Sequence, residues 1–447
     1  MSSQASARRQ ATGISRGLRG LVRYPRFRRL LAGRMAGMTA ENGLLYSLLI
    51  ALVERTNSSF NAVLLIIAYS VPAVVFGPFA GALSDRWPKR TTLVTTNLVR
   101  AGLCAALALT RPGVLGIYLV IALLSFVGQF NSPAEAAALP AVVTEEEYGA
   151  AHSLFELAQV MGQVVGMALI APIILKPFGA EPVYVLAAIG FVYAGYMQAR
   201  IPRLDKAARL RPHQPLRGFL DTYRTGWDTI RADRTSFFVV LDFVLVTTLL
   251  KLVVVLMPHY VYRVLHLDPT ATVYIAAPAA VGGVLGLLIA PWLGALFSHH
   301  RVVTGGFWLY AVVVWLLGLE VSVATFVSQQ IHLNIAGLAE KLGISSLVVS
   351  VMMLAVPLGL AFSLVGVGTR AALSSRTPEE RQAAVFGTQS AAAELFSLLP
   401  LLIGGAIADI ASPRYVLLAF ASVALLAELW TRFRYRPRQL QPARQPA

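Results

Sequence analysis

Twelve apolar runs, each close to the length of a membrane-crossing helix, constrain the fold of this chain more than any other sequence feature. They lie near 30–53, 60–83, 91–110, 113–134, 149–175 and 181–200, and then near 236–258, 271–297, 302–320, 345–369, 384–408 and 413–431. About 20 apolar residues of helix cross the hydrocarbon core of a bilayer. Only 13% of the residues are charged, against about 25% in soluble domains. The sequence therefore predicts an all-α polytopic membrane protein with twelve transmembrane helices in two six-helix halves, embedded in a lipid bilayer.

A basic segment with several prolines separates the two sets of runs. We expect a basic tail over 1–29, an N-terminal half over 30–200, a linker over 201–234, a C-terminal half over 235–431 and a second basic tail over 432–447. In the linker, apolar residues recur at helical spacing opposite arginines, which predicts an amphipathic helix. They are Leu216, Phe219, Leu220, Tyr223, Trp227 and Ile230. This helix could lie on the inner leaflet or pack against the helix bundle.

An internal repeat supports two related halves. Ala137, Ala138 and Leu139, followed by Glu145, Glu146 and Ala150, match Ala371, Ala372 and Leu373, followed by Glu379, Glu380 and Ala384, at one constant offset. That offset is close to half the chain, and both segments follow the fourth run of their half. A duplicated six-helix unit would place them there.

The distribution of cations predicts the orientation in the membrane. With both termini inside, the outside loops hold Arg55, Arg111, Lys176, Arg263, Lys341 and Arg414, and most of the 38 Lys and Arg residues lie in the inside loops and tails. Positively charged loops stay on the cytoplasmic side. We therefore expect a multi-pass protein of the inner (cytoplasmic) membrane with both termini cytoplasmic. The same rule explains the net charge of +16, so nucleic acid is not an expected partner.

Several kinds of chemistry find no support in the sequence. The single cysteine, Cys104, lies in an apolar run and excludes a thiolate zinc cluster, and we interpret it as a small buried residue. There is no glycine-rich phosphate-binding loop followed by Lys and Ser or Thr, and no Ser/His or Glu/His arrangement at a plausible depth. We expect no enzyme activity, no catalytic residues, no cofactor and no metal.

A motif begins at the end of the second run and extends from Gly81 through Asp85, Arg86, Lys89 and Arg90. It resembles the Gly-x-x-x-Asp-Arg-x-Gly-Arg/Lys-Arg signature of the major facilitator superfamily, with Pro88 in place of the usual glycine. The glycine allows close helix approach, the aspartate can face the positive N-terminus of a neighbouring helix, and the basic residues can anchor at the inner leaflet. The resemblance implies a conformational switch at this motif.

Other stretches resemble the bacterial drug efflux branch of that family, which includes macrolide and enterobactin exporters. They are Phe27 to Leu30, Arg100 in the third run, and Asn131 to Ala134 with Leu139 and Pro140 after the fourth. Glu41 fills the position of an acid that this branch often carries in its first span. Gly162 and Gly166 in the fifth run have the spacing of an antiporter pattern or of a simple packing face.

Charged residues inside the runs are the candidate site residues, since each costs about 3 kcal/mol or more at the bilayer centre. Glu41 and Glu394 lie deepest, about 15 Å from the cytoplasmic end at about 1.5 Å per residue. Asp242 and Lys251 lie on opposite faces of one helix, so each needs a partner elsewhere. We expect Arg100 to pair with an acid or a helix end, and Arg34 to reach the membrane surface. Glu41 and Glu394 are either proton or cation sites or static ion pairs.

The segment 321–344 is too long for a tight loop, and we interpret it as a surface helix of unassigned role.

The resemblance implies secondary active export of a small amphipathic, drug- or siderophore-like compound by proton antiport, by a monomer with alternating access. Uptake, flipping of a lipid such as a lysophospholipid, or a non-transporting scaffold or sensor are the alternatives. Acids on cavity faces favour transport, and acids fully paired and sealed from water favour a scaffold.

Overall fold

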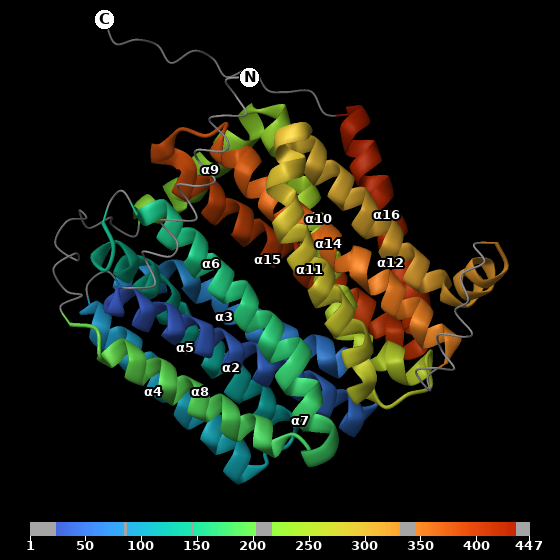
Figure 1. Ribbon diagram of the computed structural model, residues 1–447, viewed down its shortest axis with the longest axis horizontal. Coiled ribbons are helices and arrows are strands. Elements are labelled where there is room, and N and C mark those ends of the chain that lie inside the picture. The colour runs from blue at the N-terminus through green and yellow to red at the C-terminus, as the bar shows by residue number, and fades with distance from the viewer. Residues whose placement is uncertain (1–23, 85–86, 145–146, 203–216, 331–344, 435–447) are drawn as a thin grey trace, which may run out of the picture. The chain divides into compact units, whose positions relative to one another are not determined.

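The computed structural model describes residues 24–84, 87–144, 147–202, 217–330 and 345–434. Within these ranges the chain is built from helices and turns and contains no strand (Figure 1). Eleven of the described helices are long and apolar enough to cross a membrane. The predicted all-α membrane fold is therefore confirmed, with eleven such helices among the described residues where twelve were predicted.

The predicted span that is not among these eleven helices is the fifth apolar run, predicted as one helix over 149–175. The run instead comprises α6 (Tyr148–Val164), the π-helical segment η2 (Val165–Ile170) and α7 (Ala171–Phe178). Pro172 near the start of α7 has no backbone N–H and its ring disturbs the preceding turn, and wider π turns accommodate such interruptions. The run is helical throughout, but it is not one regular α-helix.

The other helices before the linker begin and end close to their predicted runs. They are α2 (Pro25–Thr56), α3 (Ser59–Ser84), α4 (Lys89–Thr110), α5 (Val114–Ala138) with the short turn η1 (Leu139–Ala141), and α8 (Glu181–Ala199). The remaining helices are α9 (Arg217–Ala232), α10 (Arg234–Arg263), η4 (Pro269–Thr272), α11 (Val273–Leu296), α12 (His299–Gln330), α14 (Ser346–Ser374), α15 (Glu379–Ile410) and α16 (Pro413–Arg434). Residues 321–330, predicted to begin a separate surface helix, continue α12, and 331–344 lie outside the described residues.

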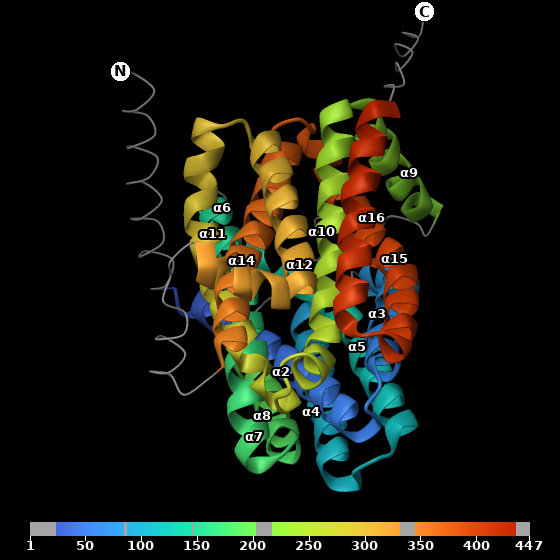
Figure 2. The same cartoon turned by 90° about the vertical axis from the view of Figure 1, so that its right-hand side faces the viewer.

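The helices form two compact units. Of the described residues, the N-terminal unit contains those up to Ala51 and those from Leu65 to 202, and the C-terminal unit contains Leu52–Leu64 and those from Arg217 onward. The last turn of α2 and the first turns of α3 thus cluster with the C-terminal unit. In that unit α10, α12 and α16 run side by side in both views (Figures 1 and 2).

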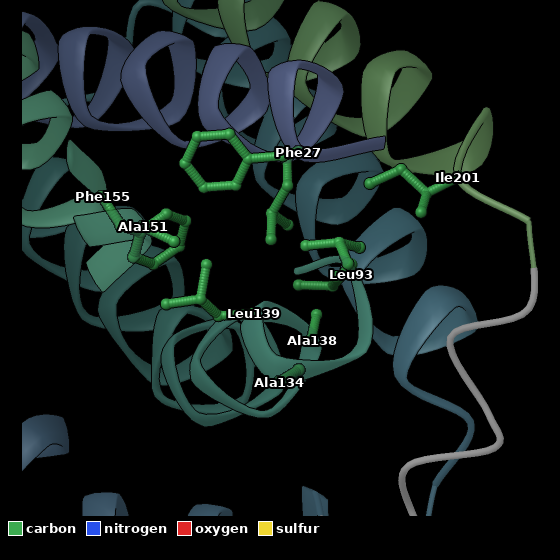
Figure 3. Packing of buried hydrophobic residues seen from close by; sticks show 10 residues of the cluster. Phe27, Leu93, Ala134, Ala138, Leu139, Ala151, Phe155 and Ile201 are labelled. Atoms are coloured by element: carbon green, nitrogen blue, oxygen red, sulfur yellow. The ribbon is translucent and has the colours of Figure 1, made fainter. Parts of the chain in front are cut away.

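An apolar cluster fills one end of the N-terminal unit. Figure 3 shows Phe27 of α2, Leu93 of α4 and Phe155 of α6 converging on small residues at the end of α5. Ala134 and Ala138 are fully buried there. Alanines at these positions let the larger rings of neighbouring helices approach, which gives the close packing found in protein interiors.

Close backbone contact joins α11 to α14 in the C-terminal unit. A Cβ atom on Gly282 of α11 would overlap the carbonyl oxygen of Val356, and one on Gly359 of α14 would overlap that of Ala279. Small residues permit such contacts between membrane helices. A side chain at either glycine would therefore push the two helices apart.

The linker helix α9 packs against the bundle. The Thr388 hydroxyl of α15 lies 3.3 Å from the carbonyl oxygen of Tyr223, and a Cβ atom on Gly226 would overlap the Ala384 backbone. Burial raises the pKa of the Tyr223 phenol. Of the two positions considered for this helix, the structure supports packing on the bundle.

Asp233 sets the start of α10. Its carboxylate accepts hydrogen bonds from the Ser236 backbone N–H (3.0 Å), the Ser236 hydroxyl (2.7 Å) and the Thr235 N–H (3.4 Å). The Arg376 guanidinium lies 3.3 Å away. Partial burial raises the pKa of Asp233, but the hydrogen bonds and Arg376 together lower it more, so its net pKa is below the usual value.

Candidate functional site

Three helices of the N-terminal unit meet at Glu41. This residue on α2 is 8% exposed and forms an ion pair with Arg100 of α4. The Tyr69 hydroxyl of α3 donates a 2.6 Å hydrogen bond to the same carboxylate. Arg100 also lies over the Phe191 ring of α8, 4.3 Å from its centroid. Arg100 thus pairs with an acid, as the sequence predicted.

Local sequence explains this arrangement. On α4 the buried side chains recur every three or four residues, so Arg100 shares an inward face with Leu93, Asn97 and Cys104. Cys104 is buried, in agreement with its interpretation. Gly128 of α5 lies next to this ion pair, because a Cβ atom on it would be 3.6 Å from the Arg100 guanidinium and 4.0 Å from the Glu41 carboxylate.

A second buried network in this unit was not predicted. Arg34 of α2 is 2.6 Å from Glu135 of α5, which also accepts a 3.0 Å hydrogen bond from Gln198 of α8. The Gln198 side-chain oxygen accepts a 2.8 Å bond from Asn97. Arg34 is buried and stacks on the Phe155 ring at 4.1 Å, so the expectation that it reaches the membrane surface is wrong.

The physical reason for that error lies in the length of α5. The fourth run was predicted to end at residue 134, next to Pro133, whereas α5 continues through Pro133 to Ala138. Glu135 therefore lies on the helix, where it neutralises Arg34. A buried partner removes the need for the arginine to seek the surface.

In the C-terminal unit, Lys251 of α10 pairs with Glu394 of α15. The Lys251 ammonium is 2.6 Å from the Glu394 carboxylate and 3.0 Å from the Ser397 hydroxyl. The side chains are 18% and 36% exposed, so this pair is more open than the one at Glu41. It brings together two of the residues that the sequence singled out.

Asp242 lies apart from Lys251 on α10 and has other partners, as expected from the opposite helix faces. Its carboxylate accepts a 3.0 Å hydrogen bond from Thr304 of α12 and lies 3.6 Å from the Arg432 guanidinium of α16. Arg432 also pairs with Glu428, one helical turn earlier. Glu428 and Arg432 were missed, although their spacing of four residues was a visible signal.

A third polar cluster in the C-terminal unit joins α3 to α15 and α10. The Asp409 carboxylate accepts hydrogen bonds from the Ser59 backbone N–H (2.5 Å), the Phe60 N–H (3.2 Å) and the Ser58 hydroxyl (2.5 Å). The Ser59 hydroxyl is 2.5 Å from His259 Nδ1. Asp409 thus caps the N-terminus of α3.

This cluster does bring Ser, His and Asp together, which the sequence did not suggest. Its geometry differs from that of a hydrolase triad, in which serine and aspartate bind opposite nitrogens of the imidazole. Here both lie on the Nδ1 side, with Asp409 3.8 Å away, and Ser59 is fully buried. The arrangement is suited to holding helices together.

The motif after α3 is described only in part. Gly81 lies on α3, Lys89 is 2% exposed in the first turn of α4 and Arg90 is exposed, while Asp85 and Arg86 lie outside the described residues. Trp87, between these positions, stacks on Phe130 of α5 with 5.7 Å between ring centroids.

Gly162 and Gly166 pack against α2. A Cβ atom on Gly162 would lie 2.8 Å from the Met35 carbonyl oxygen, and one on Gly166 would lie 2.7 Å from the Gly43 nitrogen. These glycines therefore form a packing face between α2 and the fifth run. Among the described residues, no group of three His, Cys, Asp or Glu side chains is placed to hold a metal ion.

Comparison with known proteins gives the family context. A family model described as Major Facilitator Superfamily matches residues 30–339. Macrolide efflux protein A of Streptococcus pyogenes is 23% identical over 368 residues, which cover 76% of this chain and 88% of that protein.

Solved transporters share the fold. The nucleoside transporter NupG covers 91% of this chain and 99% of its own, with a TM-score of 0.67 and 11% identity. A bacterial homologue of the iron transporter ferroportin, in an inward-facing state, covers 90% and 98%, with a TM-score of 0.63 and 14% identity.

Proposed function

The chain belongs to the major facilitator superfamily and is a membrane transporter, and on that premise we propose that it exports a small amphipathic compound by proton antiport. Export is supported by the similarity to a macrolide efflux protein over three quarters of the chain. The cargo would be drug-like or siderophore-like, as in the efflux branch that the sequence resembles. The two halves would expose the cargo to each side of the membrane in turn.

The observation that carries the proton part of this proposal is the buried Glu41 carboxylate. It forms an ion pair with Arg100 and accepts a hydrogen bond from the Tyr69 hydroxyl, so three helices meet at this carboxylate. A proton on Glu41 would remove the negative charge and leave Arg100 buried without its counter-charge. Breaking a buried ion pair costs about 3–5 kcal/mol.

That cost is large enough to matter for transport. Shifting a two-state equilibrium from 1:99 to 99:1 needs about 5.5 kcal/mol. Protonation of one buried pair is thus comparable with the whole free-energy difference between two conformations. A cationic cargo near Glu41 would compete with the proton for the same carboxylate, which links cargo binding to proton release.

Glu394 is the second acid of the proposed transport path. Its side chain is 36% exposed, whereas that of Glu41 is 10% exposed. Both acids are paired, and pairing alone would also fit a scaffold, but the family membership favours a pair that opens during transport. We propose that Glu394 and Lys251 contact cargo, and that Glu41 with Arg100 responds to protons.

The remaining parts of the proposal rest on the sequence. Asp85 and Arg86, with Gly81, Lys89 and Arg90, would stabilise one conformation by facing a neighbouring helix end, an interaction of about 0.3–2 kcal/mol. The cation distribution supports cytoplasmic termini and insertion in the inner membrane. We propose that the transporter acts as a monomer.

The test is transport in reconstituted vesicles with and without a pH gradient, using macrolides, cationic dyes and siderophores as cargo. Glu41→Gln mimics the protonated acid at almost the same volume, so it should fold and lose transport driven by the gradient. Glu181→Gln is the matched control, because it makes the same substitution in an exposed ion pair, that of Glu181 with Arg111. The assignment is wrong if Glu41→Gln pumps like the parent while Glu394→Gln or Asp242→Asn does not.

A further inference from the structure

One buried charged cluster differs from the other ion pairs because its acids outnumber its bases. The pairs Glu41–Arg100, Glu135–Arg34 and Glu394–Lys251 each contain one acid and one base. In the cluster of Asp242, Glu428 and Arg432, two carboxylates contact a single guanidinium. With both acids ionised, this cluster would carry a net negative charge inside a membrane protein.

The two carboxylates are sealed from solvent. The side chains of Asp242 and Glu428 are both 0% exposed, whereas that of Arg432 is 37% exposed. A buried charge without a counter-charge costs several kcal/mol, and proteins usually avoid this cost by neutralising the group. A bound proton is the smallest change that neutralises the cluster.

Two carboxylate oxygens without a hydrogen-bond partner also favour a bound proton in this cluster. Asp242 Oδ1 and Glu428 Oε2 are buried and have no hydrogen-bond partner in the described part of the chain. An ionised carboxylate oxygen can only accept, while a protonated one can also donate. An oxygen that accepts no hydrogen bond is more costly to bury when the carboxylate is ionised than when it is protonated, so these two oxygens favour a neutral acid in the cluster.

Among the described residues, Arg432 is the one cation in ion-pair contact with these carboxylates, and Arg234 of α10 shares the Phe238 ring with it. The groups with the strongest effect on Asp242 are Arg432, the Thr304 hydroxyl of α12 and Glu428. Thr304 accepts a 2.8 Å hydrogen bond from Arg432 and donates one to Asp242. Its hydroxyl therefore connects the two side chains but adds no charge to the cluster. One turn earlier on α12, His300 lies near Arg301, Arg376 and Arg432, and Arg376 pairs with Asp233.

We propose that Asp242 and Glu428 together bind one exchangeable proton, with Arg432 as the shared counter-charge and movable gate. Arg432 is the exposed member and lies two residues before the end of α16, so its displacement would open the acids to water. This inference rests on the proposed use of protons and adds a second proton site, in the C-terminal unit. It assigns a role to Glu428 and Arg432, which the sequence did not single out.

The test is infrared spectroscopy of the full-length protein in lipid nanodiscs at neutral pH, which needs no transport. The parent should show a carbonyl band of a protonated carboxylic acid. Asp242→Asn and Glu428→Gln should each lose it, because the acid that remains then pairs one-to-one with Arg432. Glu394→Gln is the matched control and should keep the band.

Two outcomes would overturn the inference: a parent without the band, or a band that survives in either Asp242→Asn or Glu428→Gln. If one variant does not fold, as judged by helical content and monodispersity, the other gives the same reading. Arg432→Gln should strengthen the band, because both acids then need a proton. A band that behaves as expected in a protein with no pH-dependent transport would refute the proposed antiport and leave the proton site standing.

Discussion

Replacing Glu135 by Gln isolates the energy of one buried ion pair. Arg34 and Glu135 are 8% and 3% exposed and lie 2.6 Å apart, so neither charge has much access to water. The substitution keeps the size of the side chain and an oxygen that can accept from Gln198, but it leaves Arg34 without a counter-charge. We expect a loss of about 3–5 kcal/mol in the free energy of unfolding.

The exposed pair Arg111–Glu181 supplies the control. It has almost the same length, 2.8 Å, but its side chains are 69% and 48% exposed, so Glu181→Gln should cost less than about 1 kcal/mol. Arg34→Met combined with Glu135→Gln restores neutrality and should be less destabilising than Glu135→Gln alone. Unfolding followed by tryptophan fluorescence in one detergent compares all variants. Equal losses for Glu135→Gln and Glu181→Gln, or no rescue in the double variant, would refute the argument from burial.

Three further substitutions test packing and pH dependence. In Gly359→Ala the new methyl group overlaps the backbone of α11, so the variant should lose about 1–3 kcal/mol of stability to overpacking and unfold at a lower midpoint. Gly366→Ala on the same helix has open space and should keep the midpoint of the parent. Equal midpoints for the two variants would contradict the close contact. Gly226→Leu should separate α9 from α15 and speed protease cleavage of the linker, and unchanged cleavage would argue against that packing. The pKa of Asp233 is lowered in the folded protein, so the ionised carboxylate stabilises the fold above its unfolded pKa of about 4. This stabilisation is lost as the pH falls from there through the lower folded pKa. The difference in midpoint between the parent and Asp233→Asn should therefore shrink on acidification through pH 4, and a constant difference would refute the role of the charge.

The sequence predicted the helices well because hydrophobic length along a chain is a local property. It also separated Asp242 from Lys251, since helical geometry alone decides that two residues nine positions apart face different ways. It did not predict the interruption of the fifth run, where Pro172 favours a π segment over a continuous α-helix.

The partners of the buried charges were harder to predict. Arg34 and Glu135 are 101 residues apart, and only the packing of α2 against α5 brings them together. Depth along a helix can be read from sequence, but the helix faces that meet depend on tertiary contacts. The cap on α3 provided by Asp409 is of the same kind, because its donors lie 350 residues earlier in the chain.

The most direct test of the proposed antiport is to follow protons and cargo together in the same vesicles. Purified parent protein is reconstituted with a pH-sensitive dye in the lumen, no pH gradient is imposed, and a macrolide gradient is applied across the membrane. Proton antiport predicts that macrolide entering the vesicles drives protons out, so that the internal pH rises. Glu41→Gln should abolish this change. Macrolide movement in the parent without any change in internal pH would contradict proton coupling.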